Sequence, residues 1–101
     1  MATNDQIKYE IFVSLLKRHN GPAINDVVVE GVVRVGLNKK YQYHLTQDEF
    51  YNIGDKLVEA GCFKWNDDGR LALTPVGLDY LSRLKYKYCY EYAKSPNSNN
   101  G

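Results

Sequence analysis

The feature that most constrains this chain is a change of hydrophobic period at Gly61. Before this glycine, apolar residues recur every three or four positions, as they do on one face of a helix, at Phe50, Ile53, Leu57 and Val58. After it, two short apolar segments, 62–65 and 70–73, flank a turn sequence that ends in Asp68-Gly69. An Asp-Gly pair supplies the positive φ angles that a tight hairpin needs. The sequence therefore predicts a helix that ends at Gly61 and a β-hairpin over 62–73.

Capping residues mark the helices on either side of this hairpin. Thr46 and Glu49 have the spacing of a capping box, so the helix before the hairpin should begin there. Thr74 and Pro75 suit the N-cap and the first position of a helix after the hairpin. Apolar and aromatic residues then recur at helical spacing, at Tyr80, Leu81, Leu84, Tyr88 and Tyr92. We expect a last helix over 75–93, about 28 Å long at about 1.5 Å per residue.

A first helix is predicted over 5–19. Its apolar residues make one wide stripe: Ile7, Ile11, Phe12, Leu15 and Leu16. Asn4 or Asp5 is the expected N-cap. The sequence His-Asn-Gly-Pro at 19–22 should end the helix, because glycine adopts the left-handed conformation and proline cannot continue the hydrogen-bond ladder.

The segment 24–37 allows two interpretations. Its apolar residues fall at helical spacing, which predicts a helix. The same valines also alternate, β-branched residues favour strands, and residues 30–31 could turn a hairpin. We favour the helix and leave the hairpin open. In the helix, Val29 and Val33 would form a second apolar strip that needs a partner.

Composition predicts one ordinary domain without catalytic machinery. The chain has 101 residues, a net charge of +1 and two cysteines, Cys62 and Cys89, with no zinc-type spacing. We expect reduced thiols in a cytoplasmic protein, with no signal peptide or membrane span. Phosphate loops, nucleophile elbows and metal motifs are absent from the sequence, so we expect neither an enzyme nor a cofactor or metal. The polar residues 95–101 are expected to form a disordered tail.

Two stretches resemble winged-helix regulators. Residues 57–63 (LVEAGCF) resemble the junction where the third helix ends in Leu-x-x-x-Gly before an apolar strand. Residues 73–81 (LTPVGLDYL) are similar to the Leu-Thr-x-x-Gly-x-x-x-Leu element after the wing in MarR-like and PadR-like repressors. The resemblance implies an α+β, mostly α fold over 1–94, with a three-helix core, a hairpin wing at 62–73 and a long C-terminal helix. It also implies a DNA-binding transcriptional regulator.

In DNA-binding members of this family, the third helix enters the major groove and the wing touches the backbone. Residues 38–44 read as a basic loop, and Lys39, Lys40 and Arg34 give residues 34–45 a charge of +3 because no acidic residue lies among them. Gln47 and Asn52 are capable adenine readers. Carried over by position, the resemblance implies DNA-binding residues on the third helix and the wing: Gln47, Tyr51, Asn52, Lys56, Lys64 and Arg70. The basic segment before the helix adds expected phosphate contacts: Arg34, Lys39, Lys40 and His44.

The charge of the third helix favours an alternative. Asp48, Glu49, Asp55 and Glu59 outnumber Lys56, so residues 47–59 carry −3 where a phosphate-binding surface should be positive. The alternative is a winged-helix protein–protein interaction module that uses this acidic helix and the tyrosine-rich last helix and binds no DNA.

Tyrosines are concentrated in the last helix. They occupy more than one side of it, and a helix that is apolar on more than one side needs more than one partner. We therefore expect a homodimer through this helix, using Leu84, Tyr86, Tyr88, Tyr90 and Tyr92. Trp65, at the base of the hairpin, is expected to be a packing residue.

Overall fold

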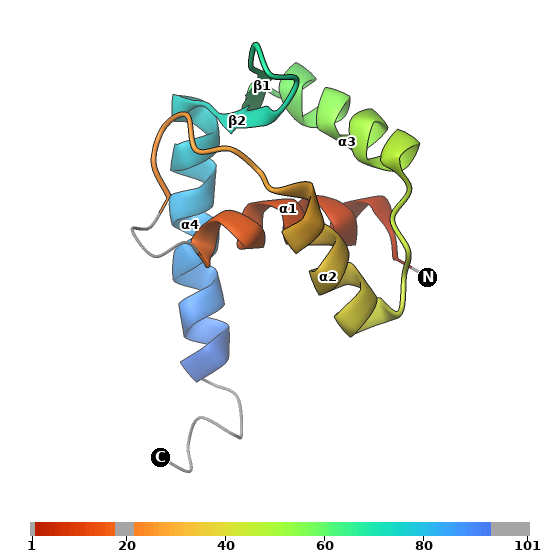
Figure 1. The fold of residues 1–101 in the computed structure, drawn as a ribbon. Coiled ribbons are helices and arrows are strands. Elements are labelled where there is room, and N and C mark those ends of the chain that lie inside the picture. Colours follow the sequence, from red (N-terminus) through yellow and green to blue (C-terminus); the bar gives the residue numbers. More distant parts are fainter. Residues whose placement is uncertain (1, 18–21, 94–101) are drawn as a thin grey trace.

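The computed structural model of the chain describes residues 2–17 and 22–93, with the backbone alone over 85–93. Over these residues the elements are α1 (Asn4–Leu16), α2 (Glu30–Tyr41), α3 (Gln47–Glu59), β1 (Phe63–Trp65), β2 (Leu71–Leu73) and α4 (Pro75–Ala93) (Figure 1). This order confirms the predicted mostly helical α+β class, the hairpin and the helix over 75–93. The first helix ends at Leu16 with Lys17 as its C-cap, so the predicted extension to residue 19 was wrong. The predicted stop sequence at 19–21 and the predicted tail at 95–101 lie outside the described residues.

Side-chain caps fix where three of the helices begin. The hydroxyl of Thr46 accepts from the amide of Glu49, whose carboxylate accepts from the Thr46 amide in return, so the predicted capping box is confirmed. Thr74 likewise caps α4 by accepting from the Gly77 amide at 3.1 Å. The predicted cap of α1 was wrong. Thr3 caps this helix and forms a reciprocal box with Gln6, one position earlier than the sequence interpretation placed it.

The predicted helix over 24–37 was wrong in its first part. Residues 24 and 25 form a turn, Val29 is extended, and Val27 forms an antiparallel bridge with Ala72 of β2. The Val28 amide donates to the Leu71 carbonyl at 2.9 Å, and the Asn25 amide donates to the Leu73 carbonyl at 2.8 Å. These bonds satisfy the edge of β2 that faces away from β1, which would otherwise present unpaired backbone groups.

The predicted basic loop over 38–44 was also wrong in its first half. Residues 38–41 form the last turn of α2, and Gln42 ends the helix in the left-handed conformation with φ +52°. Lys39 and Lys40 therefore lie on helix α2, where cations in the last turn also interact favourably with the helix dipole. The connection to α3 is the short segment 42–46.

The hairpin pairs Phe63 with Leu73 and closes through a loop that differs from the predicted tight turn. Only Gly69 in this loop has positive φ, at +74°, while Asp68 does not. The Asn66 amide donates to the Arg70 carbonyl, and the Asn66 side chain accepts from the amides of Asp68 and Arg70. This is the three-residue type of loop, with glycine at the left-handed position.

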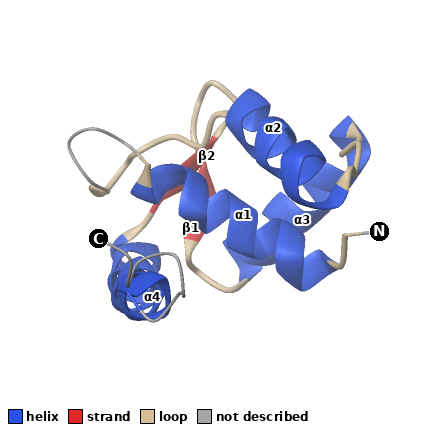
Figure 2. Cartoon of the chain, turned by 90° about the horizontal axis from the view of Figure 1, so that it is seen from below, coloured by secondary structure: helices blue, strands red, loops and turns tan. Residues whose placement is uncertain are grey.

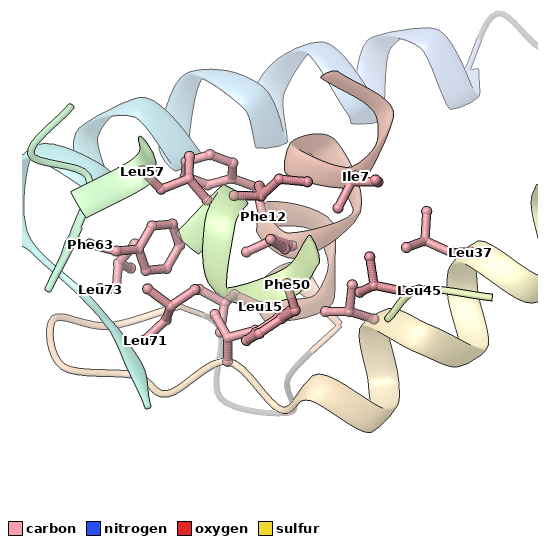
Figure 3. Close-up of a cluster of buried hydrophobic side chains, with 14 of the residues drawn as sticks. Ile7, Phe12, Leu15, Leu37, Leu45, Phe50, Leu57, Phe63, Leu71 and Leu73 are labelled. Atoms are coloured by element: carbon pink, nitrogen blue, oxygen red, sulfur yellow. The ribbon is translucent and has the colours of Figure 1, made fainter. Parts of the chain in front are cut away.

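α1 lies at the centre of the molecule. α4 stands on one side of it and α2 on the other, as the two views show (Figures 1 and 2). The core between the helices and the hairpin contains, among others, Ile7, Phe12, Leu15, Leu37, Leu45, Phe50, Leu57, Phe63, Leu71 and Leu73 (Figure 3). Within the described residues, no helix has both the length and the apolar character needed to cross a membrane.

Gly61 and Gly77 join α3, the hairpin and α4. Gly61 has φ +82°. The Cys62 amide donates to the Leu57 carbonyl and the Gly61 amide donates to the Val58 carbonyl, which is the pair of hydrogen bonds that closes many helices. A methyl group added to Gly77 would lie 1.9 Å from the Cys62 carbonyl oxygen. α4 can therefore approach this turn only with glycine at position 77. The two glycines that carry the family resemblance thus each have a structural reason.

Candidate nucleic-acid interface

The solvent-facing side of α3 is polar. Phe50, Ile53, Gly54 and Leu57 are buried, and the period of 3.6 places the polar residues on the other side. The exposed residues are Gln47, Asp48, Tyr51, Asn52, Asp55, Lys56 and Glu59. All four α3 residues in the predicted DNA-binding set, Gln47, Tyr51, Asn52 and Lys56, therefore lie at the surface. The side-chain amides of Gln47 and Asn52 can both donate and accept hydrogen bonds there.

Trp65 fastens the hairpin to α3. Its indole Nε1 donates to the Asp55 carboxylate at 2.8 Å, and its ring lies 5.6 Å from that of Tyr51. The indole also covers Gly54, where an added methyl group would lie 2.8 Å from two ring carbons. The prediction that Trp65 is a packing residue is confirmed. Its packing holds the hairpin and the exposed face of α3 in a fixed relation.

The hairpin carries two exposed cations beside this anchor. Lys64 lies between Phe63 and Trp65, and alternation along a strand turns its side chain to the opposite face, where it is exposed. Arg70 is exposed at the end of the loop. Asp67 and Asp68 are exposed in the same loop, so the tip of the hairpin carries two carboxylates beside Arg70.

Lys40 forms an ion pair with a buried carboxylate. Its Nζ lies 2.9 and 3.2 Å from the two carboxylate oxygens of Glu10, which is only 2 % exposed. Desolvation lowers the pKa of Lys40, but the hydrogen bond and the charge of Glu10 outweigh it, so the pKa is raised. Gly36 leaves the space that the carboxylate occupies, since an added methyl group would lie 2.4 Å from Glu10 Oε1. The pair joins α1 to α2.

Arg34 also makes internal contacts. Its guanidinium donates to the Leu45 carbonyl at 2.5 Å and lies 3.4 Å from the Glu30 carboxylate. It therefore ties α2 to the segment that leads into α3. Lys39 and His44, by contrast, are exposed. Of the basic residues predicted before α3, the structure leaves these two facing solvent without a partner among the described residues.

Glu49 does not belong to the exposed acidic face of α3. One carboxylate oxygen accepts from Thr46, and the other accepts a short hydrogen bond from the Tyr43 hydroxyl. The Tyr43 bond lowers the pKa of Glu49, with the bonds from Thr46 acting in the same direction, and the same contact raises the pKa of Tyr43. The sequence-based charge of −3 overstates what α3 presents. Its exposed face carries three carboxylates, Asp48, Asp55 and Glu59, against Lys56.

Residues expected to form the dimer interface fall in two groups. Leu84 is half-buried and packs against the core. It borders a hollow of about 310 Å³ between α1, the end of α3 and α4, which Phe12, Tyr80 and Cys62 also line. Burial raises the pKa of the Cys62 thiol. The side chains of Tyr86, Tyr88, Tyr90 and Tyr92 lie outside the described residues, although the α4 backbone continues to Ala93.

Sequence reasoning missed Glu10 and Tyr43 as positioning residues. A charge at position 10, between Ile7 and Ile11 on the apolar stripe of α1, is a signal that a buried partner is needed. Tyr43 carries no comparable signal. Comparison of the chain with protein-family models, curated proteins and solved structures finds no match.

Proposed function

We propose that this chain is a winged-helix DNA-binding protein and a transcriptional regulator. In this proposal α3 enters the major groove, and β1 and β2 form the wing that contacts the DNA backbone. The observation that carries the proposal is the anchoring of the hairpin to α3 through Trp65. Because of this anchor, the exposed polar face of α3 and the cations of the hairpin meet a duplex as one preformed surface.

Chemistry divides this surface into base readers and phosphate contacts. Gln47 and Asn52 suit base recognition, since each amide can bond to the N6 and N7 atoms of adenine. Lys56, Lys64 and Arg70 suit phosphate contacts, as their charges are exposed. Lys39 and His44 extend the phosphate-binding set on the side of α2. Lys40 and Arg34 have a structural role in this proposal and do not contact phosphates. Lys40 pairs with Glu10, and Arg34 contacts Glu30 and a backbone carbonyl.

A homodimer through α4 completes the proposal. The C-terminal part of α4 extends past α1 and away from the three-helix body (Figure 1). A second copy packed along this part would present two copies of α3 to one duplex, which doubles the number of phosphate contacts.

Fluorescence anisotropy of a labelled mixed-sequence duplex over a salt series tests the proposal. Binding should weaken with salt, and log K against log salt should have a slope of about −0.9 for each phosphate neutralised. Lys64→Gln should weaken binding to all sequences and reduce the slope by about 1, while the matched variant Arg83→Gln on α4 should leave both unchanged. Asn52→Ala should change sequence preference. No binding at low salt, or binding without a salt slope, would refute the proposal.

The second candidate is a protein–protein interaction module without DNA binding. It is favoured by the three exposed carboxylates on α3, Asp48, Asp55 and Glu59, and by the acidic tip of the hairpin. Asp48→Asn with Glu59→Gln separates the two functions. In the DNA-binding proposal this pair of substitutions strengthens duplex binding, because it removes repulsion from the phosphates. In the interaction module it leaves the protein unable to bind DNA and weakens binding to a basic partner.

A further inference from the structure

Exposed apolar side chains gather at one place on the surface. Seven large hydrophobic residues are exposed among the described residues, and four of them fall within twelve positions: Ile24, Val29, Val32 and Val35. Val35, at 64 % exposure, is the most exposed of the seven. Small proteins rarely leave apolar side chains clustered in water without a partner. The strip predicted at Val29 and Val33 was wrong for Val33, which is buried in the core, while Val32 and Val35 are exposed beside Val29.

This face of α2 is hollowed. A hollow of about 420 Å³ is lined by Val29, Val32 and Val35 together with Lys39. A second hollow of about 230 Å³ toward the end of α1 shares Val29, Val32 and Lys17 with the first. Neither hollow is lined by a residue of α3 or the hairpin. The groove follows α2 from position 29 to position 39, about 15 Å, which is about three turns of a helix lying along it.

Gly31 lines this groove, and nothing within the described protein requires glycine at this position. Its φ is not positive, and an added methyl group would meet nothing within 4 Å. Gly31 is the second residue of α2, so neither a helix end in the left-handed conformation nor a close internal contact requires glycine there. Gly36, in the same groove, makes room for Glu10, but Gly31 makes room for nothing inside the described protein. A glycine of this kind lets the backbone of a partner approach closely.

The charge around the groove has one sign. Lys17 and Lys39 line it, and no carboxylate does so among the described residues. Neither lysine has an ion-pair partner within the described part of the chain. A second copy seated here about a two-fold axis would bring four lysines together with no carboxylate between them. The concave shape is likewise poorly suited to a flat lipid surface.

We propose that the groove formed by Val29, Val32, Val35, Gly31 and the two lysines binds an acidic amphipathic helix of another protein. The partner's apolar residues, spaced at i, i+3 or i+4 and i+7, pack on the valines, and its carboxylates face Lys17 and Lys39. The groove contains no residue of α3. Lys39 is the one residue that it shares with the proposed DNA-binding set.

Fluorescence polarisation with two designed helical peptides tests the proposal. The acidic peptide carries leucines at i, i+3, i+4 and i+7 with glutamates elsewhere, and the basic peptide replaces each glutamate with lysine. The acidic peptide should bind with a Kd of about 10 μM or tighter and at least about ten times more tightly than the basic one. Absence of binding at about 1 mM, or equal binding of both peptides, would overturn the proposal.

Three variants locate the binding. Gly31→Gln should weaken binding of the acidic peptide at least about tenfold without destabilising the fold, since an added side chain meets nothing within 4 Å. Lys17→Glu should reverse the preference toward the basic peptide. Lys8→Glu, on the other side of α1, is the charge-matched control and should change nothing. Lys39 stays unaltered because it also belongs to the proposed DNA-binding set.

Two other outcomes would also overturn this proposal. Binding of phosphatidylserine vesicles that Lys17→Glu abolishes, without peptide binding, would assign the groove to membranes. A dimer that Gly31→Gln dissociates would assign it to a second copy of the chain. Duplex binding by Gly31→Gln should equal that of the wild type, so loss of peptide binding and loss of DNA binding are separate results.

Discussion

Removing the ammonium of Lys40 should destabilise the fold far more than removing that of its neighbour Lys39. Lys40→Met leaves the Glu10 carboxylate buried without the cation that both of its oxygens contact, at 2.9 and 3.2 Å. Gly36 leaves the space that this carboxylate occupies. Lys39 is exposed and makes no ion pair within the described residues, so Lys39→Met is a matched control that removes the same charge from the same helical turn.

The exposed fractions of the two side chains set the size of the effect. Breaking a fully buried ion pair costs about 3–5 kcal/mol, whereas an exposed pair contributes about 0–1 kcal/mol. The Glu10 side chain is 3 % exposed and that of Lys40 is 43 % exposed, which places this pair between the two limits. We expect Lys40→Met to cost about 2 kcal/mol, or about 10 °C in Tm for a domain of this size. Lys39→Met should stay within about 0.5 kcal/mol of the wild type.

Urea unfolding of a double-mutant cycle measures the effect. Glu10→Met should cost less than Lys40→Met, because the freed ammonium can turn to solvent and the freed carboxylate cannot. The double variant should be close to wild type, which gives a coupling free energy of about 2–3 kcal/mol. A coupling below about 0.5 kcal/mol, or equal effects of Lys39→Met and Lys40→Met, would refute the structural role of Lys40.

The pH dependence of the same cycle has a definite sign. Because the pKa of Lys40 is raised in the folded protein, the pair stabilises the fold fully below the ordinary value of 10.5. Its contribution is lost as the pH rises through the folded value. The difference in unfolding free energy between wild type and Lys40→Met should therefore be constant near neutral pH and should narrow above pH 10.5.

Three further predictions concern the joints around α3. Gly77→Ala should cost about 2 kcal/mol or more in urea unfolding, since the new methyl group collides with a backbone carbonyl; unchanged stability would contradict the close approach of α4. Trp65→Phe should cost about 1 kcal/mol through loss of the bond to Asp55, and Asp55→Ala combined with it should add little. Glu49→Gln should be less stable than wild type at neutral pH. Because the Tyr43 bond lowers the pKa of Glu49, this gap should shrink as the pH falls below 4.5; a constant gap would exclude the carboxylate's role.

The second half of the chain could be predicted because its signals are local. The capping box at Thr46, the glycine at 61 and the Thr-Pro pair at 74–75 each specify a backbone feature within a few residues. Helix α3, the hairpin and α4 therefore formed where the sequence placed them. The hairpin loop was predicted less well, since Asp-Gly fits both a two-residue turn and the three-residue loop that Asn66 closes.

The first half depends on contacts that sequence periodicity does not reveal. The valines at 27–29 fit a helix or a strand, and the choice was made by hydrogen bonds to β2, more than forty residues away. The helix then begins at Glu30 and continues through the residues that were read as a loop. Local propensity could not foresee this, because the unpaired edge of β2 exists only after the hairpin has formed.

The candidate site was predictable where it depended on helix period and unpredictable where it depended on pairing. Gln47, Asn52 and Lys56 face solvent because four buried residues fix the orientation of α3. Lys40 and Arg34 carry the same charge as Lys39 in the sequence, yet Glu10 and the Leu45 carbonyl engage them in the fold. Counting basic residues in the sequence therefore overstates the number of unpaired cations before α3. Counting acidic residues likewise overstates the negative charge that α3 exposes.

NMR titration of the ¹⁵N-labelled protein with a mixed-sequence DNA duplex at low salt shows directly whether α3 and the hairpin form a DNA-binding surface. If α3 and the hairpin bind DNA, we expect amide chemical-shift changes along the exposed face of α3, at Lys64 and Arg70 in the hairpin and in the segment 42–46. Amides of the valine face of α2 should remain unchanged, and added salt should reverse every shift. Shift changes confined to other surfaces, or no change at any DNA concentration, would contradict the assignment of α3 and the hairpin as a DNA-binding surface.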